Sequence, residues 1–429
     1  MTVLSKQENF TNLAKRKLGH METVMAMSQK FADGTTQGAL VITVRGKITF
    51  SALLDAAEIV FRKYTLLRCM IETHLDDLYF VEHNDFSRIA VNYKQVTSFD
   101  DWEDTEGEYL HDTIDHVSAL WQLNLLSKSE DEHKIVLVLH HAIVDADAAK
   151  EIIRDLLCYT DDIMRDIHVS FDPLGMPAAV DDFLSPYFGT SADGAIKCNP
   201  IPYHIRSSIG SRRTRFMHDK LSVSDYSNLE NKCKKDNISI DSAFGSALYL
   251  AVVSSGLANP PVAFRTAVSL REYAATKRPF MNELGCYIAV ADTTLEVKNQ
   301  DFLLTANEYY KKLLVNTINH SVKKKNISTV DVYNNINSMK TGNDFSGFAI
   351  TNTGEMNPSA KFECFSVEDV YNITNRVGGN NAFVLQVSSF KGEPRFIFAY
   401  VDPLLHKNVF EELCKHFKRH LANYYEDVV

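Results

Sequence analysis

The order of hydrophobic and polar residues in the first half of the chain predicts alternating helices and strands. Apolar residues recur at helical spacing over residues 21–30 and 51–64, which is typical of helices with one buried face. Short apolar or alternating runs predict strands over residues 39–44, 68–74, 78–81, 120–126 and 135–140. The run Ile135-Val-Leu-Val-Leu139 is unbroken, as in a strand buried on both faces, and a helix is predicted from Asp147 onward.

The pattern lapses between residues 170 and 215, where prolines and glycines are frequent, and then resumes. Helices are predicted over residues 223–235, 240–254, 299–319 and 405–424, and strands over 262–269, 285–294, 347–352, 382–390 and 394–401. The sequence therefore predicts an α/β protein with an N-terminal subdomain over residues 1–175, a connecting segment over 176–215 and a C-terminal subdomain over 216–429.

The ends of the two halves resemble each other. The run Ile135 to Asp145 is followed by a predicted helix, and so is the run Arg395-Phe-Ile-Phe-Ala-Tyr-Val-Asp402. This order of strand, aspartate and helix suits a chain built from two similarly wound halves. Because the second copy lacks the histidines that precede Asp145, we expect one site per chain.

Composition and charge narrow the class of protein. A chain of 429 residues that is 45% hydrophobic is long enough for two domains with their own cores. Its net charge of −10 argues against nucleic-acid binding, which needs clustered Lys and Arg. The seven cysteines include no CxxC pair, so neither a disulfide framework nor a zinc site is indicated. This use of cysteine fits a reducing cytoplasm, and the sequence has neither a signal-peptide core nor an apolar run long enough to span a membrane. We therefore expect a cytoplasmic protein, and separately we expect a monomer.

Polar chemistry is most concentrated at the end of the predicted strand 135–140. His140, His141 and Asp145 fall within one short turn before the predicted helix. Successive strand residues point to opposite faces, so the two histidines are not expected to address the same atom. We expect one to face a channel and the other to face the packed interior.

The sequence His140-His141-Ala-Ile-Val-Asp145-Ala146 resembles the HHxxxDG motif of a family of acyltransferases. This family includes nonribosomal-peptide condensation domains, polyketide-associated acyltransferases, wax ester synthases and alcohol acetyltransferases. Further segments resemble family motifs in the family order: Arg16-Lys-Leu-Gly-His-Met-Glu22, Tyr64-Thr-Leu-Leu-Arg68, Ala267-Val-Ser-Leu-Arg271, Asn282-Glu-Leu-Gly-Cys-Tyr287 and Ile350-Thr-Asn352-Thr-Gly354.

The chain also departs from the family pattern. Ala146 stands where the motif has glycine, which restricts the backbone more. Tyr64-Thr65 replaces a His-Pro pair, and the DFGWG segment of the plant branch is not found.

The resemblance implies a chloramphenicol-acetyltransferase-like fold, with two similar α/β subdomains and an active-site tunnel between them. It also implies transfer of an acyl group from acyl-CoA or a phosphopantetheinyl carrier protein to a hydroxyl or amine of a small-molecule acceptor, with no permanently bound cofactor. His141 would be the general base and His140 a packed support. Asp145 would form a structural salt bridge with Arg271, and Asn352 would lie near the reaction intermediate. The motif has no serine or cysteine nucleophile beside the histidine, which favours direct attack on the thioester.

Each role has an alternative. His141 could be a structural histidine, Asp145 could cap the following helix by accepting a backbone N–H, and Asn352 could be an ordinary turn residue before Gly354. The basic runs that include Lys15, Arg212 and Lys323 are typical of solvated surface, but one of them could meet the phosphates of coenzyme A or an acidic carrier protein.

Two alternatives concern the whole function. Two histidines and a carboxylate can hold iron or zinc, although adjacent strand residues diverge and no HExxH cluster is present. The replacement of glycine by Ala146 also leaves open a degenerate member of the family, which would bind a carrier protein without catalysis.

Overall fold

The computed structural model describes residues 13–99, 106–183, 198–275, 283–297, 301–323, 328–358 and 361–426. The chain forms two compact units, and each takes in several segments. Unit 1 comprises Met1–Phe183, Arg271–Tyr287 and Met356–Asn375, and unit 2 comprises Leu184–Leu270, Ile288–Glu355 and Arg376–Val429. Two segments from the second half of the chain thus belong to unit 1. A division of the chain into continuous ranges does not group these segments with the N-terminal residues.

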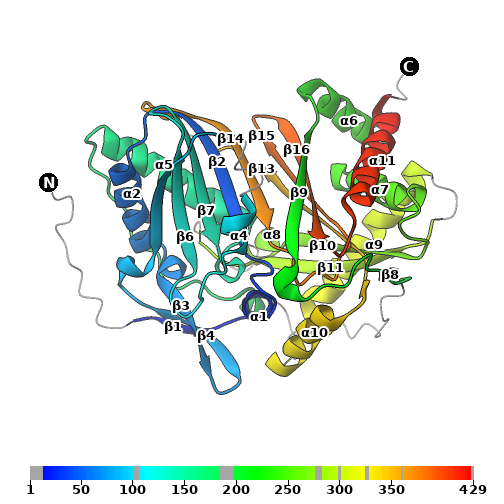
Figure 1. Ribbon diagram of the computed structural model, residues 1–429, viewed down its shortest axis with the longest axis horizontal. Helices are drawn as coiled ribbons and strands as arrows, with labels where there is room; N and C mark the ends of the chain where they lie inside the picture. Colours follow the sequence, from blue (N-terminus) through cyan, green and yellow to red (C-terminus); the bar gives the residue numbers. More distant parts are fainter. Residues whose placement is uncertain are drawn as a thin grey trace. The chain divides into compact units, whose positions relative to one another are not determined.

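Unit 1 is built on a five-stranded sheet in which β7 is the middle strand (Figure 1). The strand order is β14 (Phe365–Thr374), β2 (Gly38–Gly46), β7 (Glu132–Leu139), β6 (Trp121–Ser127) and β5 (Ala90–Gln95). Neighbouring strands are antiparallel except for the parallel pair β5 and β6. Every residue of β7 from His133 to Leu139 is buried, as the unbroken apolar run predicts.

The helices of unit 1 are α1 (His20–Phe31), α2 (Phe50–Lys63), α4 (Glu106–His111), α5 (Ala146–Met164) and α8 (Arg271–Ala275). Helices α2 and α5 lie side by side along one face of the sheet (Figure 1). A second, three-stranded sheet has the order β1 (Lys15–Lys17), β4 (Asp77–Glu82) and β3 (Cys69–His74). The chain enters α5 directly from the turn that follows β7, so this turn lies between a buried strand and a packed helix.

Unit 2 has a six-stranded sheet. Its strand order is β11 (Ile288–Leu295), β10 (Val262–Ser269), β13 (Phe348–Glu355), β15 (Val384–Phe390), β16 (Glu393–Asp402) and β9 (Arg213–Lys220). The pairs β10–β13 and β13–β15 are parallel. Strands β8 (Ile201–Pro202) and β12 (Asp344–Phe345) form a short pair of their own.

The helices of unit 2 are α6 (Val223–Asp236), α7 (Ile240–Ser254), α9 (Phe302–Lys323), α10 (Thr329–Thr341) and α11 (Lys407–Glu426). Helix α7 packs against both α9 and α11, and its residues from Ser242 to Val252 are all buried. The core of unit 2 therefore lies around α7.

All the predicted helices and strands overlap elements of the structure, and the predicted α/β class is confirmed. Residues 184–197 of the predicted connecting segment and residues 299–300 of one predicted helix lie outside the described residues. The elements of six or more residues that the pattern did not predict are β5, β9, β14, α4 and α10. In β5, five of the six residues are exposed, so this strand has little apolar alternation to detect.

Candidate functional site

His140 lies at the end of β7 and is fully buried. Its Nδ1 accepts the backbone N–H of Ala142 at 3.1 Å, so the proton of the neutral ring is on Nε2. Burial, with smaller contributions from His116 and His141, lowers the pKa of His140 to about 3. His140 is therefore a neutral packed residue that holds the turn over residues 141–143.

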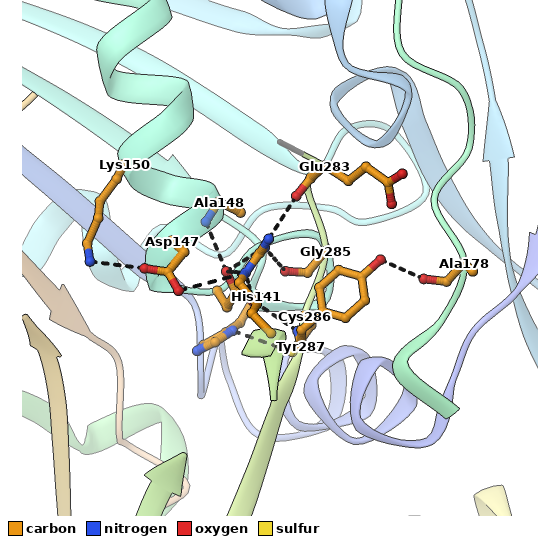
Figure 2. Close-up of polar contacts among 11 residues, drawn as sticks. His141, Asp147, Ala148, Lys150, Ala178, Glu283, Gly285, Cys286 and Tyr287 are labelled. Carbon is orange, nitrogen blue, oxygen red and sulfur yellow. Dashed lines mark hydrogen bonds and ion pairs between the residues drawn. The ribbon is translucent and has the colours of Figure 1, made fainter. Parts of the chain in front are cut away.

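His141 begins this turn and is partly exposed. The expectation that the two histidines differ in their surroundings is met, because only His140 is buried. The Nδ1 atom of His141 lies 3.9 Å from the Sγ atom of Cys286 (Figure 2). In the tautomer whose Nδ1 carries the proton and faces this sulfur, the lone pair of the neutral ring is on Nε2.

Asp145 is the N-cap of α5 and also pairs with Arg271. Its Oδ1 accepts the backbone N–H of Ala148 at 2.9 Å. Arg271 donates to both carboxylate oxygens, from Nε at 3.0 and 2.8 Å and from an Nη atom at 2.8 Å. The two roles considered for Asp145, helix cap and ion pair, thus occur together in the same side chain.

Arg271 connects Asp145 to the segment over residues 283–287. It donates to the carbonyl oxygens of Glu283 at 3.2 Å and Gly285 at 3.5 Å, and its guanidinium lies 5.0 Å from the ring centre of Tyr287. The side chain of Arg271 is 15% exposed and that of Asp145 is 3% exposed. Arg271 also lies 3.9 Å from the more exposed carboxylate of Asp147. The shorter, less exposed pair with Asp145 depends on both partners, because removal of one leaves a buried charge with less compensation.

Residues 283–287 also take part in this network of polar contacts (Figure 2). The backbone N–H of Tyr287 donates to Asp145 at 3.0 Å, and its hydroxyl donates to the carbonyl oxygen of Ala178 at 2.8 Å. Gly285 forms a parallel bridge with Val144 and has a φ of +150°, where a Cβ atom would lie 2.2 Å from the Tyr287 ring. Glycine is therefore needed at position 285. Asn282 of the matched sequence segment lies outside the described residues.

Ala146, which stands in place of the motif glycine, is the first residue of α5. Helical backbone geometry is open to any L-residue except proline in the helix interior. The alanine therefore fits this turn without strain, and the departure from the motif does not distort the site.

Cys286 was not among the residues singled out from the sequence. Its thiol is buried, and burial together with the nearby Asp145 carboxylate raises its pKa well above the usual value. Nucleophilic cysteines have a lowered pKa, so this thiol is suited to packing against His141 more than to attacking a substrate. A lone cysteine before a tyrosine has no local signal that would have identified it.

Asn352 belongs to β13 in unit 2 and is exposed. Its Nδ2 donates to Asp241 at 2.7 Å, and its Oδ1 accepts the backbone N–H of Gly354 at 3.0 Å. The second contact is that of a turn asparagine. A role for Asn352 near the reaction intermediate stays a prediction.

Within the described residues, no three His, Cys, Asp or Glu side chains come together as a group that could hold a metal ion. None of the helices described is both long and apolar enough to cross a membrane.

Comparisons with known proteins match the chain by structure. No protein-family model matches the sequence, and no curated protein matches it. The epimerization domain from the third module of tyrocidine synthetase B is 12% identical, with a TM-score of 0.72 over 97% of this chain and 98% of that one. Polyketide synthase associated protein 5 from Mycobacterium tuberculosis is 16% identical, with a TM-score of 0.71 over 96% of this chain and 98% of that one.

A third similar structure is an acetyltransferase. The trichothecene 15-O-acetyltransferase TRI3 from Fusarium sporotrichioides is 13% identical, with a TM-score of 0.71 over 96% of this chain and 95% of that one. The chain thus has the condensation-domain, chloramphenicol-acetyltransferase-like fold over nearly its whole length, as the sequence motifs predict. The names of these structures include an epimerization domain and an acetyltransferase, so the fold alone does not decide the reaction.

Proposed function

We propose that the protein is an acyltransferase that moves an acyl group from a thioester, either acyl-CoA or an acyl carrier protein, to a hydroxyl or amine of a small-molecule or natural-product acceptor. The observation that carries this proposal is the partly exposed His141 in a turn anchored by the Asp145–Arg271 pair. An acetyltransferase with the same fold supports it.

In the proposed reaction, Nε2 of His141 takes the proton of the acceptor hydroxyl or amine as that group attacks the thioester carbonyl carbon. An imidazole suits this task because its unperturbed pKa lies near neutral pH. The tetrahedral intermediate then collapses, the carbon–sulfur bond breaks, and the leaving thiolate takes the proton from the imidazolium. The products are the ester or amide and the free thiol of the donor, so protons and electrons balance without a further reactant.

Direct attack is favoured over an acyl-enzyme route. A covalent route would use Cys286, the thiol nearest to His141 among the described contacts. This thiol is buried and its raised pKa disfavours the thiolate, which is the reactive form. We therefore propose a ternary complex of enzyme, thioester and acceptor, with no cofactor bound permanently.

The proposal is tested with the purified full chain. A panel of acyl-CoA thioesters and acyl-loaded carrier proteins is incubated with alcohol and amine acceptors, and both thiol release and acylated product are measured, the latter by mass spectrometry. We expect product formation that requires His141 and that survives thorough chelation. Activity that disappears with a chelator and returns with iron or zinc would contradict the proposal in favour of a metal site.

A protein that binds carrier protein or thioester but gives no product across this panel would support the alternative of a degenerate, non-catalytic member of the fold. His141→Ala serves as the matched control, because it removes the proposed base from a partly exposed position. Product formed equally by His141→Ala and the native protein would contradict the role of His141.

A further inference from the structure

Arg376 is the first residue of unit 2 after β14, in the loop that leads to β15. Its backbone N–H donates to the hydroxyl of Thr214 at 2.8 Å, and its carbonyl oxygen accepts the N–H of Gly379 at 2.8 Å. Thr214 is a buried residue of β9. The backbone at position 376 is therefore fixed against the sheet of unit 2.

The side chain of Arg376 has no such partner among the described residues. Its Nε is buried and has no hydrogen-bond acceptor, although the residue as a whole keeps some exposed surface. No carboxylate of the described residues pairs with it, and burial alone lowers its pKa to about 10. A buried charge without a partner costs free energy in the absence of a ligand.

Two other buried arginines of the described residues, Arg68 and Arg212, have partners for their side chains. Arg68 pairs with Glu82 at 2.6 Å in unit 1. Arg212, in unit 2, donates to the carbonyl oxygens of Ser207, Lys340 and Val377 at 2.9 to 3.2 Å. Arg376 is thus an exception that the packing of unit 2 does not explain.

Arg212 also adds positive charge beside the same loop, because it donates to the carbonyl oxygen of Val377, the neighbour of Arg376. Its partners are neutral carbonyl groups, so its charge is not cancelled by a carboxylate. Arg212 belongs to the basic run that the sequence marks as a candidate for contact with phosphates. Arg376 in the loop after β14 and Arg212 beside this loop are therefore two positive charges that no described carboxylate pairs with. They lie in a protein whose net charge is −10.

We propose that Arg376 binds a phosphate group of the thioester donor. The planar guanidinium donates in pairs to phosphate oxygens, and a polyanionic donor approaching an acidic protein needs a local cationic contact. Coenzyme A and a carrier protein share this chemistry, since both present pantetheine through a phosphate. The identity of the ligand as an acyl donor rests on the proposed function, whereas the phosphate contact does not.

The proposal is tested by calorimetric titration of the full chain and its Arg376→Gln variant with coenzyme A, 3′-dephospho-coenzyme A, phosphopantetheine and pantetheine. Loss of charged hydrogen bonds to a phosphate should weaken the binding of coenzyme A by about 10- to 100-fold. Binding of pantetheine, which has no phosphate, should be the same for both proteins. Equal affinity of the two proteins for coenzyme A would overturn the proposal.

The ligands separate the two sources of the phosphate. If the loss extends to phosphopantetheine, Arg376 contacts the phosphate that coenzyme A shares with a carrier protein. If the loss is confined to coenzyme A and 3′-dephospho-coenzyme A, the contact is to the diphosphate of the free coenzyme. Either result supports phosphate recognition. Binding through Arg376 without turnover of any thioester would contradict the proposed function alone.

Stability measurements distinguish a ligand contact from a structural role. Arg376→Gln should raise the melting temperature of the ligand-free protein, because an unpaired buried charge is removed, and it should abolish the rise that coenzyme A produces in the native protein. Arg212→Gln is the matched control and should lower the melting temperature, since three carbonyl groups lose their donor. The proposal would be overturned if the melting temperature fell in Arg376→Gln as it does in the control and coenzyme A still raised it.

Discussion

Arg271 donates hydrogen bonds to both carboxylate oxygens of Asp145 at 2.8 to 3.0 Å, although 126 residues separate them in the sequence. The same carboxylate caps α5 and accepts the backbone N–H of Tyr287. One side chain therefore holds together the helix that follows the histidine turn, the short helix α8 and the segment over residues 283–287. Cys286, which lies beside His141, belongs to the last of these segments.

We expect Asp145→Ala and Arg271→Ala each to lower the free energy of unfolding by about 3 to 5 kcal/mol, because each removes one partner of an ion pair with little solvent contact. The double variant should lose less than the sum of the two, since the residues are in contact. Urea denaturation of the four proteins measures this. Fully additive losses would contradict an energetic coupling between the residues. The exposed pair Lys17–Asp77 is the control and should show a coupling of about 1 kcal/mol or less.

Replacement of the two histidines should separate catalysis from folding. His141→Ala should lower turnover by about 100- to 10,000-fold, the usual contribution of a positioned general base, with little change in melting temperature, because His141 is partly exposed. His140→Ala should act mainly by lowering the melting temperature, because that ring is fully buried. Normal turnover in His141→Ala, with turnover abolished in a folded His140→Ala, would reverse the two assignments.

Cys286→Ala should keep turnover within a few-fold of the native rate, because direct attack on the thioester does not use the thiol. Its melting temperature should fall slightly, since a buried group is removed. Steady-state kinetics and mass spectrometry of the protein mixed with donor alone measure both points. An acylated native enzyme that is missing in Cys286→Ala, together with lost turnover, would establish the covalent route instead. Cys414→Ala, at another buried cysteine, is the control for the packing effect.

Gly285→Ala should lower both the melting temperature and turnover. Position 285 has a φ of +150°, and an added Cβ would lie 2.2 Å from the Tyr287 ring, so the segment that contacts Asp145 and Arg271 would have to shift. Thermal denaturation and kinetics of the variant measure the effect. Gly210→Ala is the matched control, because nothing lies within 4 Å of a Cβ at that position. A Gly285→Ala variant as stable and active as this control would show that the conformation at position 285 is not needed.

The protein should lose stability as the pH falls below about 6.5. Burial lowers the pKa of His140 to about 3 and that of His116 to about 4, whereas both are near 6.5 in the unfolded chain. Between these values the unfolded state binds more protons, so acid favours unfolding. Each histidine should contribute a loss of about 2 kcal/mol between pH 7 and pH 5.

Urea denaturation at several pH values measures this dependence. The variants His140→Asn and His116→Asn should each show a smaller loss of unfolding free energy between pH 7 and pH 5 than the native protein. An unchanged pH dependence in both variants would show that other groups cause the acid sensitivity.

Most of the fold could be predicted because its elements have strong local patterns. The apolar run that forms β7 and the helical spacing of α5 depend only on neighbouring residues. Strand β14 was missed because it belongs to unit 1 only through pairing with β2, more than 300 residues earlier in the chain. The strand begins with alternating buried and exposed residues, but a bulge between Val367 and Asp369 interrupts this alternation.

The sequence by itself determined the local chemistry: an apolar strand that ends in two histidines with different surroundings, followed by an aspartate at the start of a helix. Its resemblance to known motifs also pointed to Arg271 as the partner of Asp145. Only the tertiary structure decided that Cys286 lies beside His141, that Gly285 must lack a side chain, and that the Nε atom of Arg376 is buried without a hydrogen-bond acceptor. These properties depend on which distant segments fill the space around a residue, and packing of that kind is not encoded in the pattern of any one segment.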